Sequence, residues 1–490
     1  MRVFRRGAVG AVSLVAAVAL VAVQQVPAAA ASIEERYAKQ LVKKVTGQNA
    51  RKHMVALQAI ADHNGGNRAV GTKGYDLSAA YVALRLGLAG YKVTLDPINF
   101  VENWVENSPP VLEQLSPASK AYVPNQDFFT FTPSPAGDVT ATVQNVDLTL
   151  PPAPLPSSTS GCEMSDFDDF VRGNIALIQR GTCPFATKIR NAGFAGASGI
   201  IVFNEGQPTR TDAEPLDLGE WRAGVPMVYA DFNVGHELAF NPGTRVRLKV
   251  DSTLTLGTDY NVLGETRKGD PNNVVMVGAH LDSVEEGPGI NDNGSGTAAI
   301  LETAIQLGGF APVKNKVRFA FWAAEEVGLL GSDQYVEGLT DAQRDRIRVY
   351  LNFDMVASPN YAYMLYDGDD SDGTGAPAGP PGSAQIESQL ARFFAGRGLP
   401  TVGTDFTGRS DYGPFIAVGI PSGGIFTGAE GIKTPAEAAL FGGTAGVAYD
   451  VCYHQACDTL ANPNLTALDV NADAIADSTA RYAFNLTSIP

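Results

Sequence analysis

The feature that most limits the fold is a series of apolar runs in the second half of the chain, each ending in polar residues. The runs are NNVVMVGAHLD (272–282), KNKVRFAFWAAEE (314–326), VYLNFDMVAS (349–358) and YAYMLYD (361–367). Nearly continuous apolar runs of this length are typical of central strands in a sheet that is covered on both faces. Helical patterns separate them, at 297–308, 328–348, 383–396 and 464–482. This alternation predicts an α/β fold with a doubly wound sheet.

An αβ unit near the N-terminus has the pattern of the same domain. Residues 77–100, LSAAYVALRLGLAGYKVTLDPINF, read as a helix, a glycine stop and a strand. From about residue 115 the pattern changes to short strands around a helix, bounded by turn residues, which indicates a separate compact module. We therefore expect a discontinuous α/β domain of residues 32–115 and 253–490, with residues 116–252 inserted as a second, β-rich domain.

Residues 1–31 have the composition of a secretory signal peptide. Three arginines precede an apolar stretch, and the segment ends in AAAAS, so cleavage is expected near Ala31. A membrane anchor is the alternative, because the apolar stretch is borderline in length. The signal peptide predicts a protein that is secreted outside the cell and is free of the membrane after cleavage.

The cysteines agree with export, and the net charge argues against one class of partner. An exported chain with an even number of cysteines favours disulfides, and closeness in sequence pairs Cys162 with Cys183 and Cys452 with Cys457. The formal charge of −16 argues against a nucleic-acid partner, because phosphate backbones are bound by clustered Lys and Arg.

Charged side chains gather at the ends of three of the apolar runs. The first run ends in His280 and Asp282, the second in Glu325 and Glu326, and the third in Asp354. Ligands of an open α/β sheet bind at the carboxyl ends of its strands, so these side chains should lie near one another. Imidazole and carboxylate groups together are the ligands that suit Zn²⁺.

Further residues fit the same metal site. Asp292 lies on a glycine-rich loop that lets the backbone approach closely, and His454 provides a second imidazole between two cysteines. Asp282 shares a strand face with His280 and is placed to orient its imidazole. The adjacent Glu325 and Glu326 indicate divided roles, one as a metal ligand and the other as a proton acceptor.

As a set, these motifs resemble secreted di-zinc aminopeptidases of the aminopeptidase S and leucyl aminopeptidase type, family twenty-eight of the metallopeptidases. The resemblance rests on the stretches AHLDS, GINDNGSGTAAILE, FAFWAAEEVGLLGSDQYV, LNFDMVAS, GRSDYGPF and YHQACDTL. The segment GNIALIQRGTCPFATKIRNAGFAGASGIIVFN in the middle module is similar to a protease-associated (PA) domain. The resemblance implies a sheet of the zinc exopeptidase type with an inserted PA domain.

The resemblance also implies a role for each site residue. His280 and Asp354 would bind one of two zinc ions, Glu326 and His454 the other, and Asp292 would bridge both. Glu325 resembles the general base of the family, and Tyr453 the tyrosine that stabilises the oxyanion.

Two features of the resemblance lie outside the ligand set. The segment around Arg409 would hold the α-amine of the substrate. Asp469 and Asp473 have the spacing of a calcium site in the family, and an exposed helix face explains that spacing equally well.

The implied function is removal of N-terminal residues, large and apolar such as Leu, from peptides or proteins by a monomeric enzyme. Two alternatives stay open from the sequence. One is a carboxypeptidase or dipeptidase of the glutamate carboxypeptidase type, which shares the metal ligands and the PA domain. The other is a non-catalytic binding module on the same fold.

Overall fold

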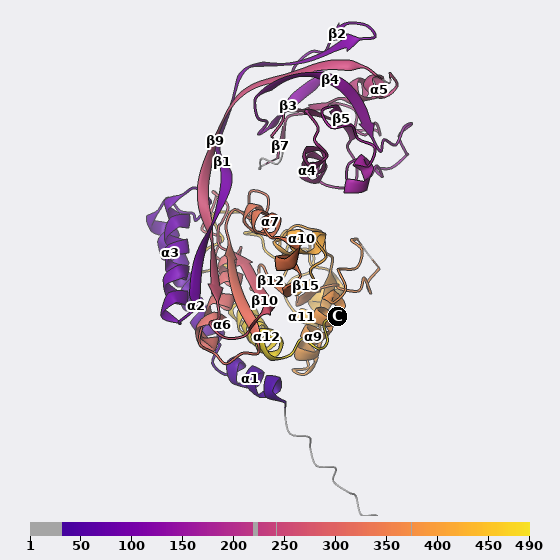
Figure 1. Ribbon diagram of the computed structural model, residues 1–490. Coiled ribbons are helices and arrows are strands. Elements are labelled where there is room, and N and C mark those ends of the chain that lie inside the picture. The colour runs from indigo at the N-terminus through magenta and orange to yellow at the C-terminus, as the bar shows by residue number, and fades with distance from the viewer. Residues whose placement is uncertain (1–31, 219–223, 242, 374) are drawn as a thin grey trace, which may run out of the picture.

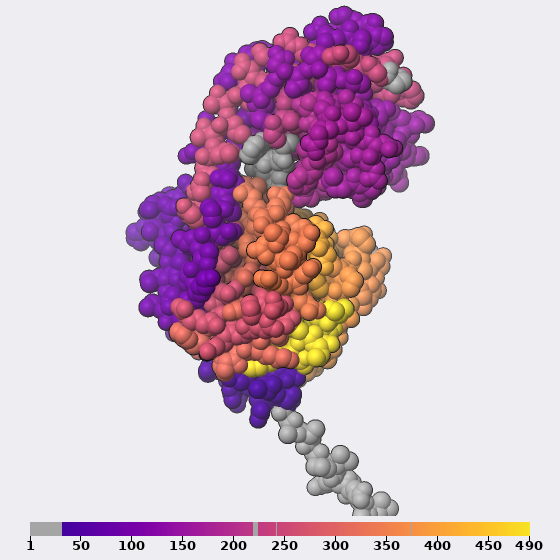
Figure 2. Space-filling view, viewed as in Figure 1, coloured from indigo at the N-terminus to yellow at the C-terminus, as the bar shows by residue number. Residues whose placement is uncertain are grey.

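A computed structural model of the protein describes residues 32–218, 224–241, 243–373 and 375–490. The signal peptide predicted at residues 1–31 lies outside this part of the chain. Two bodies are joined by a long antiparallel ribbon of β1 (Lys92–Ser116) and β9 (Arg245–Glu265) (Figure 1). In the space-filling view the inserted body lies above the larger one, next to α7 (Leu330–Glu337) and α10 (Tyr412–Ala417) (Figure 2).

The larger body has a mixed sheet. Its strands follow the order β14-β13-β15-β12-β10-β11-β9, and β9 also pairs with β1. The central pairs β12–β10 and β10–β11 are parallel, whereas β9 and β13 run antiparallel to their neighbours β11 and β15. The bounds of these strands are β10 Asp270–His280, β11 Asn315–Trp322, β12 Ile347–Phe353, β13 Met364–Tyr366, β14 Val402–Thr404 and β15 Ser422–Phe426.

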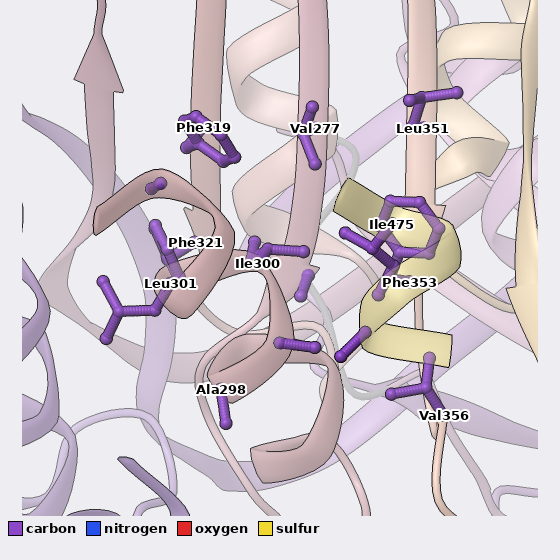
Figure 3. Close-up of a cluster of buried hydrophobic side chains, with 14 of the residues drawn as sticks. Val277, Ala298, Ile300, Leu301, Phe319, Phe321, Leu351, Phe353, Val356 and Ile475 are labelled. Carbon is purple, nitrogen blue, oxygen red and sulfur yellow. The ribbon is translucent and has the colours of Figure 1, made fainter. Parts of the chain in front are cut away.

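Helices cover both faces of this sheet because its strands alternate apolar side chains between two cores. Along β10, Val275 and Val277 point into the core under α6 (Gly294–Leu307) and α12 (Leu465–Phe484). Val274 and Met276 point toward α7 and α10. Figure 3 shows the first core, with the strand residues packed against Ile300 of α6 and Ile475 of α12. The remaining helices of this body are α1 Ile33–Val42, α2 Gly47–His63, α3 Lys73–Leu88, α8 Asp341–Arg344, α9 Ser383–Ala395 and α11 Pro435–Phe441.

The inserted body has its own core on each side of a small sheet. Ile175 and Leu177 of β5 face one core, and Ala176 and Ile178 face the other. Its elements are β2 Lys120–Ala121, β3 Phe128–Thr132, β4 Gly137–Val146, the 3-10 helix Met164–Phe167, β5 Ile175–Gln179, α4 Phe185–Ala195, β6 Gly199–Phe203, β7 Leu216–Asp217, β8 Met227–Ala230 and α5 Phe232–Ala239. The expected domain boundaries, 115/116 and 252/253, fall within the continuous strands β1 and β9 rather than in loops.

One helical pattern of the sequence corresponds to two helices in the structure. The single helical pattern expected over 328–348 is divided into α7 and α8, with a break at Gly338–Thr340. Thr340 begins α8 with a capping box to Gln343, which starts a new helix instead of continuing α7. Among the described residues, no helix is long and apolar enough to cross a membrane.

The tight packing of the sheet predicts a cost for adding one methyl group at Gly278. A Cβ at Gly278 would lie 2.3 Å from Tyr350 Oη and 2.7 Å from Trp322 Nε1, two atoms that hydrogen-bond to each other at 2.8 Å. We expect Gly278→Ala to lower the free energy of unfolding by about 1–3 kcal/mol, measured by urea denaturation. Gly87→Ala is the control, because nothing lies within 4 Å of that position in α3. An unchanged stability of Gly278→Ala would contradict the packing.

Candidate metal centre

Three neighbouring strands deliver the predicted site residues to one edge of the sheet. His280 is the last residue of β10, and it pairs in parallel register with Trp322, the last residue of β11. β12 ends at Phe353, directly before Asp354. Because parallel strands end at the same edge, residues from distant parts of the sequence converge there.

Five predicted ligands form two groups that share Asp292. His280, Asp292 and Asp354 make up the first, Asp292, Glu326 and His454 the second, and within each group the donor atoms lie within 4.8 Å of one another. His280 Nε2 is 3.1 Å from Asp292 Oδ1 and 3.3 Å from Asp354 Oδ1. His454 Nε2 is 3.3 Å from Asp292 Oδ2 and 2.9 Å from Glu326 Oε2. Each carboxylate oxygen of Asp292 therefore faces a different group.

The chemistry of these donors fits a divalent metal. Two carboxylate oxygens, Glu326 Oε1 and Asp354 Oδ1, are buried with no hydrogen-bond partner. A buried carboxylate oxygen that accepts no hydrogen bond is costly, and coordination of a cation would remove this cost. Imidazole nitrogen with carboxylate oxygen is a ligand combination that Zn²⁺ uses, so each group suits a zinc ion.

The electrostatics of the site favour positive charge. Burial lowers the pKa of His280, but the carboxylates of Asp354 and Glu325 outweigh this and hold it well above its ordinary value. Burial also lowers the pKa of His454, whereas its contact with Asp292 contributes to raising it to about 10. Both imidazoles are thus held by surrounding negative charge, which is the environment that a metal dication requires.

Asp282 connects His280 with the two glutamates. Its Oδ1 faces His280 Nδ1 at 3.6 Å, which is longer than a hydrogen bond. The main-chain N–H groups of Glu325 and Glu326 donate to the two Asp282 oxygens at 3.2 and 3.3 Å. Asp282 therefore holds the backbone of the glutamate pair and faces the imidazole through an ion-pair contact.

Glu325 is placed differently from the metal-binding groups. Its Oε2 lies 4.0 Å from His280 Nε2, and burial together with the charges of Asp354 and Glu326 raises its pKa well above the ordinary value. A carboxylate with a raised pKa beside a metal centre is suited to accept a proton near neutral pH.

The backbone is constrained at three points next to these side chains. Ala324, Met355 and His454 have φ values of 56°, 49° and 55°, in the left-handed region that non-glycine residues rarely adopt. Ala324 precedes Glu325, Met355 follows Asp354, and His454 carries the second imidazole. Such conformations persist where the surrounding structure enforces them, and they concentrate at functional sites.

A cavity of about 430 Å³ opens beside the metal centre. Tyr453 and Arg409 both line it, and the Tyr453 ring stacks on the His454 ring with centroids 3.8 Å apart. Arg409 Nη1 is 2.7 Å from Glu430 Oε1 on the exposed rim. Apolar and aromatic side chains form much of the wall, namely Met355, Met364, Tyr366, Tyr412, Phe426 and Tyr449.

The aspartates expected to bind calcium have protein partners instead. Asp469 Oδ1 accepts the main-chain N–H of Gly47 at 2.7 Å, and Asp473 Oδ2 pairs with Arg397 at 2.7 Å. Neither aspartate belongs to a group of three potential ligands in the described residues. Calcium binding at Asp469 and Asp473 stays a prediction.

Both expected disulfides are present. Cys162 is bonded to Cys183, and Cys452 to Cys457. The second disulfide closes the short loop that carries His454, so it limits the movement of that imidazole.

Several residues around the site were not identified from the sequence. The Asp458 carboxylate accepts the N–H of Asp292 at 2.9 Å, and the guanidinium of Arg68 bonds to the loop before Asp292. Ser410 Oγ donates to Asp354 Oδ2 at 2.7 Å, and Asp411 is buried close by, with its pKa raised to about 7 by burial. The only local signal was that Asp458, Ser410 and Asp411 lie within the quoted motifs YHQACDTL and GRSDYGPF, where no role was assigned to them.

The fold and the paired donor groups define a protein with a metal site at the carboxyl edge of a mixed sheet. Residues 261–479 match the model of Peptidase family M28, and residues 143–238 match that of the PA domain. An aminopeptidase of Pseudomonas aeruginosa is 49% identical over 430 residues, which cover 87% of this chain and 79% of the relative. A probable leucine aminopeptidase 2 of Aspergillus oryzae is 47% identical over 364 residues, which cover 74% of this chain and 71% of the relative. The chain belongs to peptidase family M28.

Solved structures agree with this membership. An aminopeptidase from Aneurinibacillus sp. strain AM-1 has a TM-score of 0.51 at 26% identity, covering 90% of this chain and 95% of that one. A zinc aminopeptidase from Bacillus subtilis has a TM-score of 0.51 at 25% identity, and the match covers 89% of this chain and 94% of that one. The predicted α/β fold with an inserted PA domain is confirmed, as is the enzyme class, a metallo-aminopeptidase.

Proposed function

We propose that the protein uses two zinc ions to remove N-terminal residues, preferentially large apolar ones such as leucine, from peptides. The observation that carries the proposal is the position of Asp292, whose two oxygens face two separate donor groups 3.1 and 3.3 Å away. One carboxylate shared in this way is suited to hold two cations side by side.

Each zinc ion has its own ligands in this proposal. His280 and Asp354 would hold one, Glu326 and His454 would hold the other, and Asp292 would be shared between them. When bound, the two ions lower the pKa of a water and polarise the scissile carbonyl.

Glu325 is the proposed general base. Its carboxylate accepts a proton from the attacking water and delivers it to the nitrogen of the leaving amine. Its burial beside the donor groups, with Oε2 4.0 Å from His280 Nε2, supports this role. Asp282 keeps the carboxylate in place through the Glu325 main-chain N–H.

Tyr453 is the proposed oxyanion donor. Its side chain lines the cavity next to the second donor group and is kept there by stacking on His454. Burial is the main cause that raises the pKa of its hydroxyl, which therefore stays protonated and able to donate a hydrogen bond at neutral pH.

The charge of the cavity supports an aminopeptidase over a carboxypeptidase. Among the described residues that line it, Arg409 is the one cation, and it is paired with Glu430. The carboxylates of Asp372, Asp405 and Glu437 also line the cavity. Negative charge attracts the free α-amine of a peptide and repels a terminal carboxylate, so the segment around Arg409 suits an N-terminus.

An assay with blocked peptides tests this function. We expect hydrolysis of L-leucine p-nitroanilide and of leucyl-glycine amide, and at least about 100-fold slower hydrolysis of their N-acetyl forms, because acetylation removes the positive amine. EDTA should abolish the activity and added Zn²⁺ restore it. Cleavage of N-acetyl-leucyl-glycine at a similar rate would instead support the carboxypeptidase alternative, and activity unaffected by EDTA would contradict the metal mechanism.

The remaining parts of the proposal concern the chain as a whole. The catalytic domain consists of residues 32–115 and 253–490, and the inserted PA domain of residues 116–252. Both disulfides support secretion after removal of a signal peptide, because disulfides persist in oxidising compartments. We also propose that the enzyme is a monomer and that its substrates are the N-termini of peptides or proteins.

A further inference from the structure

Arg68 is a buried cation that contacts the loop between two proposed zinc ligands. It follows α2 and has no solvent exposure. Its guanidinium donates to the carbonyl oxygens of Leu281, Pro288 (2.9 Å) and Gly289 (2.7 Å). Its main-chain N–H also donates to Ser283 Oγ at 2.9 Å. One side chain thus contacts both ends of the loop at 281–289.

The contacts of Arg68 are close to the ligands in sequence and in space. Leu281 lies between His280 and Asp282, and Gly289 lies three residues before Asp292. Gly289 has a φ of 59°, and a Cβ there would lie 2.2 Å from Asp292 O and 3.2 Å from Arg68 Nη2. The loop is therefore folded tightly around the guanidinium, and a shift of the loop would move both ligands.

Asp458 holds the same loop from its other side. Its carboxylate accepts the main-chain N–H groups of Asn291 (2.8 Å) and Asp292 (2.9 Å). Arg68 interacts attractively with the charges of Asp282, Asp458 and Asp292. The carbonyls of the loop are bound by a cation and its amides by an anion, so the segment has a single well-defined path to Asp292.

We propose that Arg68 is a positioning residue for zinc binding: it holds His280 and Asp292 at the separation that the two metal ions need. The inference rests on the proposed function. Lysine cannot replace it, because a single ammonium does not span three carbonyls as the planar guanidinium with its five donors does.

The test compares the zinc affinity of Arg68→Lys with that of Arg318→Lys. Arg318 is a partly buried arginine of β11 that bonds to Glu265 and Tyr335 instead of the zinc site. Zinc dissociation constants are measured by competition with a chromophoric chelator, at a temperature where circular dichroism shows each variant folded. We expect Arg68→Lys to weaken zinc binding about 10–100-fold, as is usual for residues that orient metal ligands. Arg318→Lys should change it less than twofold, even if its Tm falls.

A second variant covers the case in which Arg68→Lys does not fold. Ser283→Ala leaves the guanidinium in place and removes a hydroxyl that accepts the Arg68 main-chain N–H and donates to the carbonyl oxygens of Val284 and Gly287 in the same loop. We expect it to weaken zinc binding severalfold with an unchanged circular dichroism spectrum. Wild-type zinc affinity in folded Arg68→Lys, or in Ser283→Ala if the former is unfolded, would overturn the inference and leave the proposed function intact. A wild-type protein that binds no zinc would instead overturn the proposed function.

Discussion

Replacing Glu325 with glutamine lowers kcat for leucine p-nitroanilide by about 100- to 10,000-fold, the range that a positioned general base contributes. Glutamine has the same shape but accepts no proton at the amide. Glu325 is not among the five proposed ligands, so the variant should keep the zinc content and the Tm of the wild type. The measurements are steady-state kinetics and zinc per chain by elemental mass spectrometry.

Glu286→Gln is the matched control for this substitution. Glu286 is an exposed glutamate on the loop between His280 and Asp292, so its change removes one charge near the site without touching the cavity. We expect wild-type kinetics for it. Wild-type activity of Glu325→Gln would show that another group takes the proton, whereas loss of zinc together with activity would make Glu325 a ligand.

The second large effect is expected at the shared carboxylate. Asp292→Asn removes the negative charge that faces both donor groups, and an amide nitrogen replaces one ligand oxygen. We expect the affinity for both zinc ions to fall by more than the 10–100-fold typical of residues that only orient ligands. Zinc retained per chain after dialysis at a defined free zinc concentration, together with the hydrolysis rate, measures this loss.

Asp367→Asn separates the effect of Asp292 from a general loss of negative charge. Asp367 is a buried carboxylate that lies near Asp369 and Glu387, and it accepts the main-chain N–H groups of Ser371 and Asp372. Asparagine has a single carbonyl oxygen and can accept only one of those two N–H groups, so we expect a somewhat lower stability. Because Asp367 belongs to neither donor group of the metal centre, zinc binding there and activity should not change. Two zinc ions retained by Asp292→Asn with wild-type affinity would rule out a shared ligand.

The strands that carry the site were predictable because they are fully buried. A strand covered on both faces must be apolar along its whole length, so its end is marked where polar residues begin, as at His280 and Asp354. β15 was not predicted because it lacks a continuous apolar run, although it pairs with β12 within the sheet. Its sequence SGGIF has two glycines, and a Cβ at Gly424 would lie 1.8 Å from Asn352 O, so close packing there requires glycine rather than an apolar side chain.

The residues that support the ligands were not predictable in the same way. Arg68 and Asp458 act through hydrogen bonds to main-chain atoms of residues more than 160 positions away in sequence. A hydrogen bond to a main-chain atom does not depend on the side chain of the partner residue. It therefore produces no motif or spacing in the sequence that could predict it. Asp282 was predicted as a partner of His280, but its hydrogen bonds to the main-chain N–H groups of Glu325 and Glu326 were not.

Local sequence was enough to identify the strands, the chemistry of the ligands and the family. These properties follow from burial and from residue type, which a short stretch of sequence records. Only the tertiary structure reveals that Asp292 divides its two oxygens between two donor groups and that Arg68 holds the loop before it. Such distances depend on how segments far apart in the chain pack together, and no single segment carries that information.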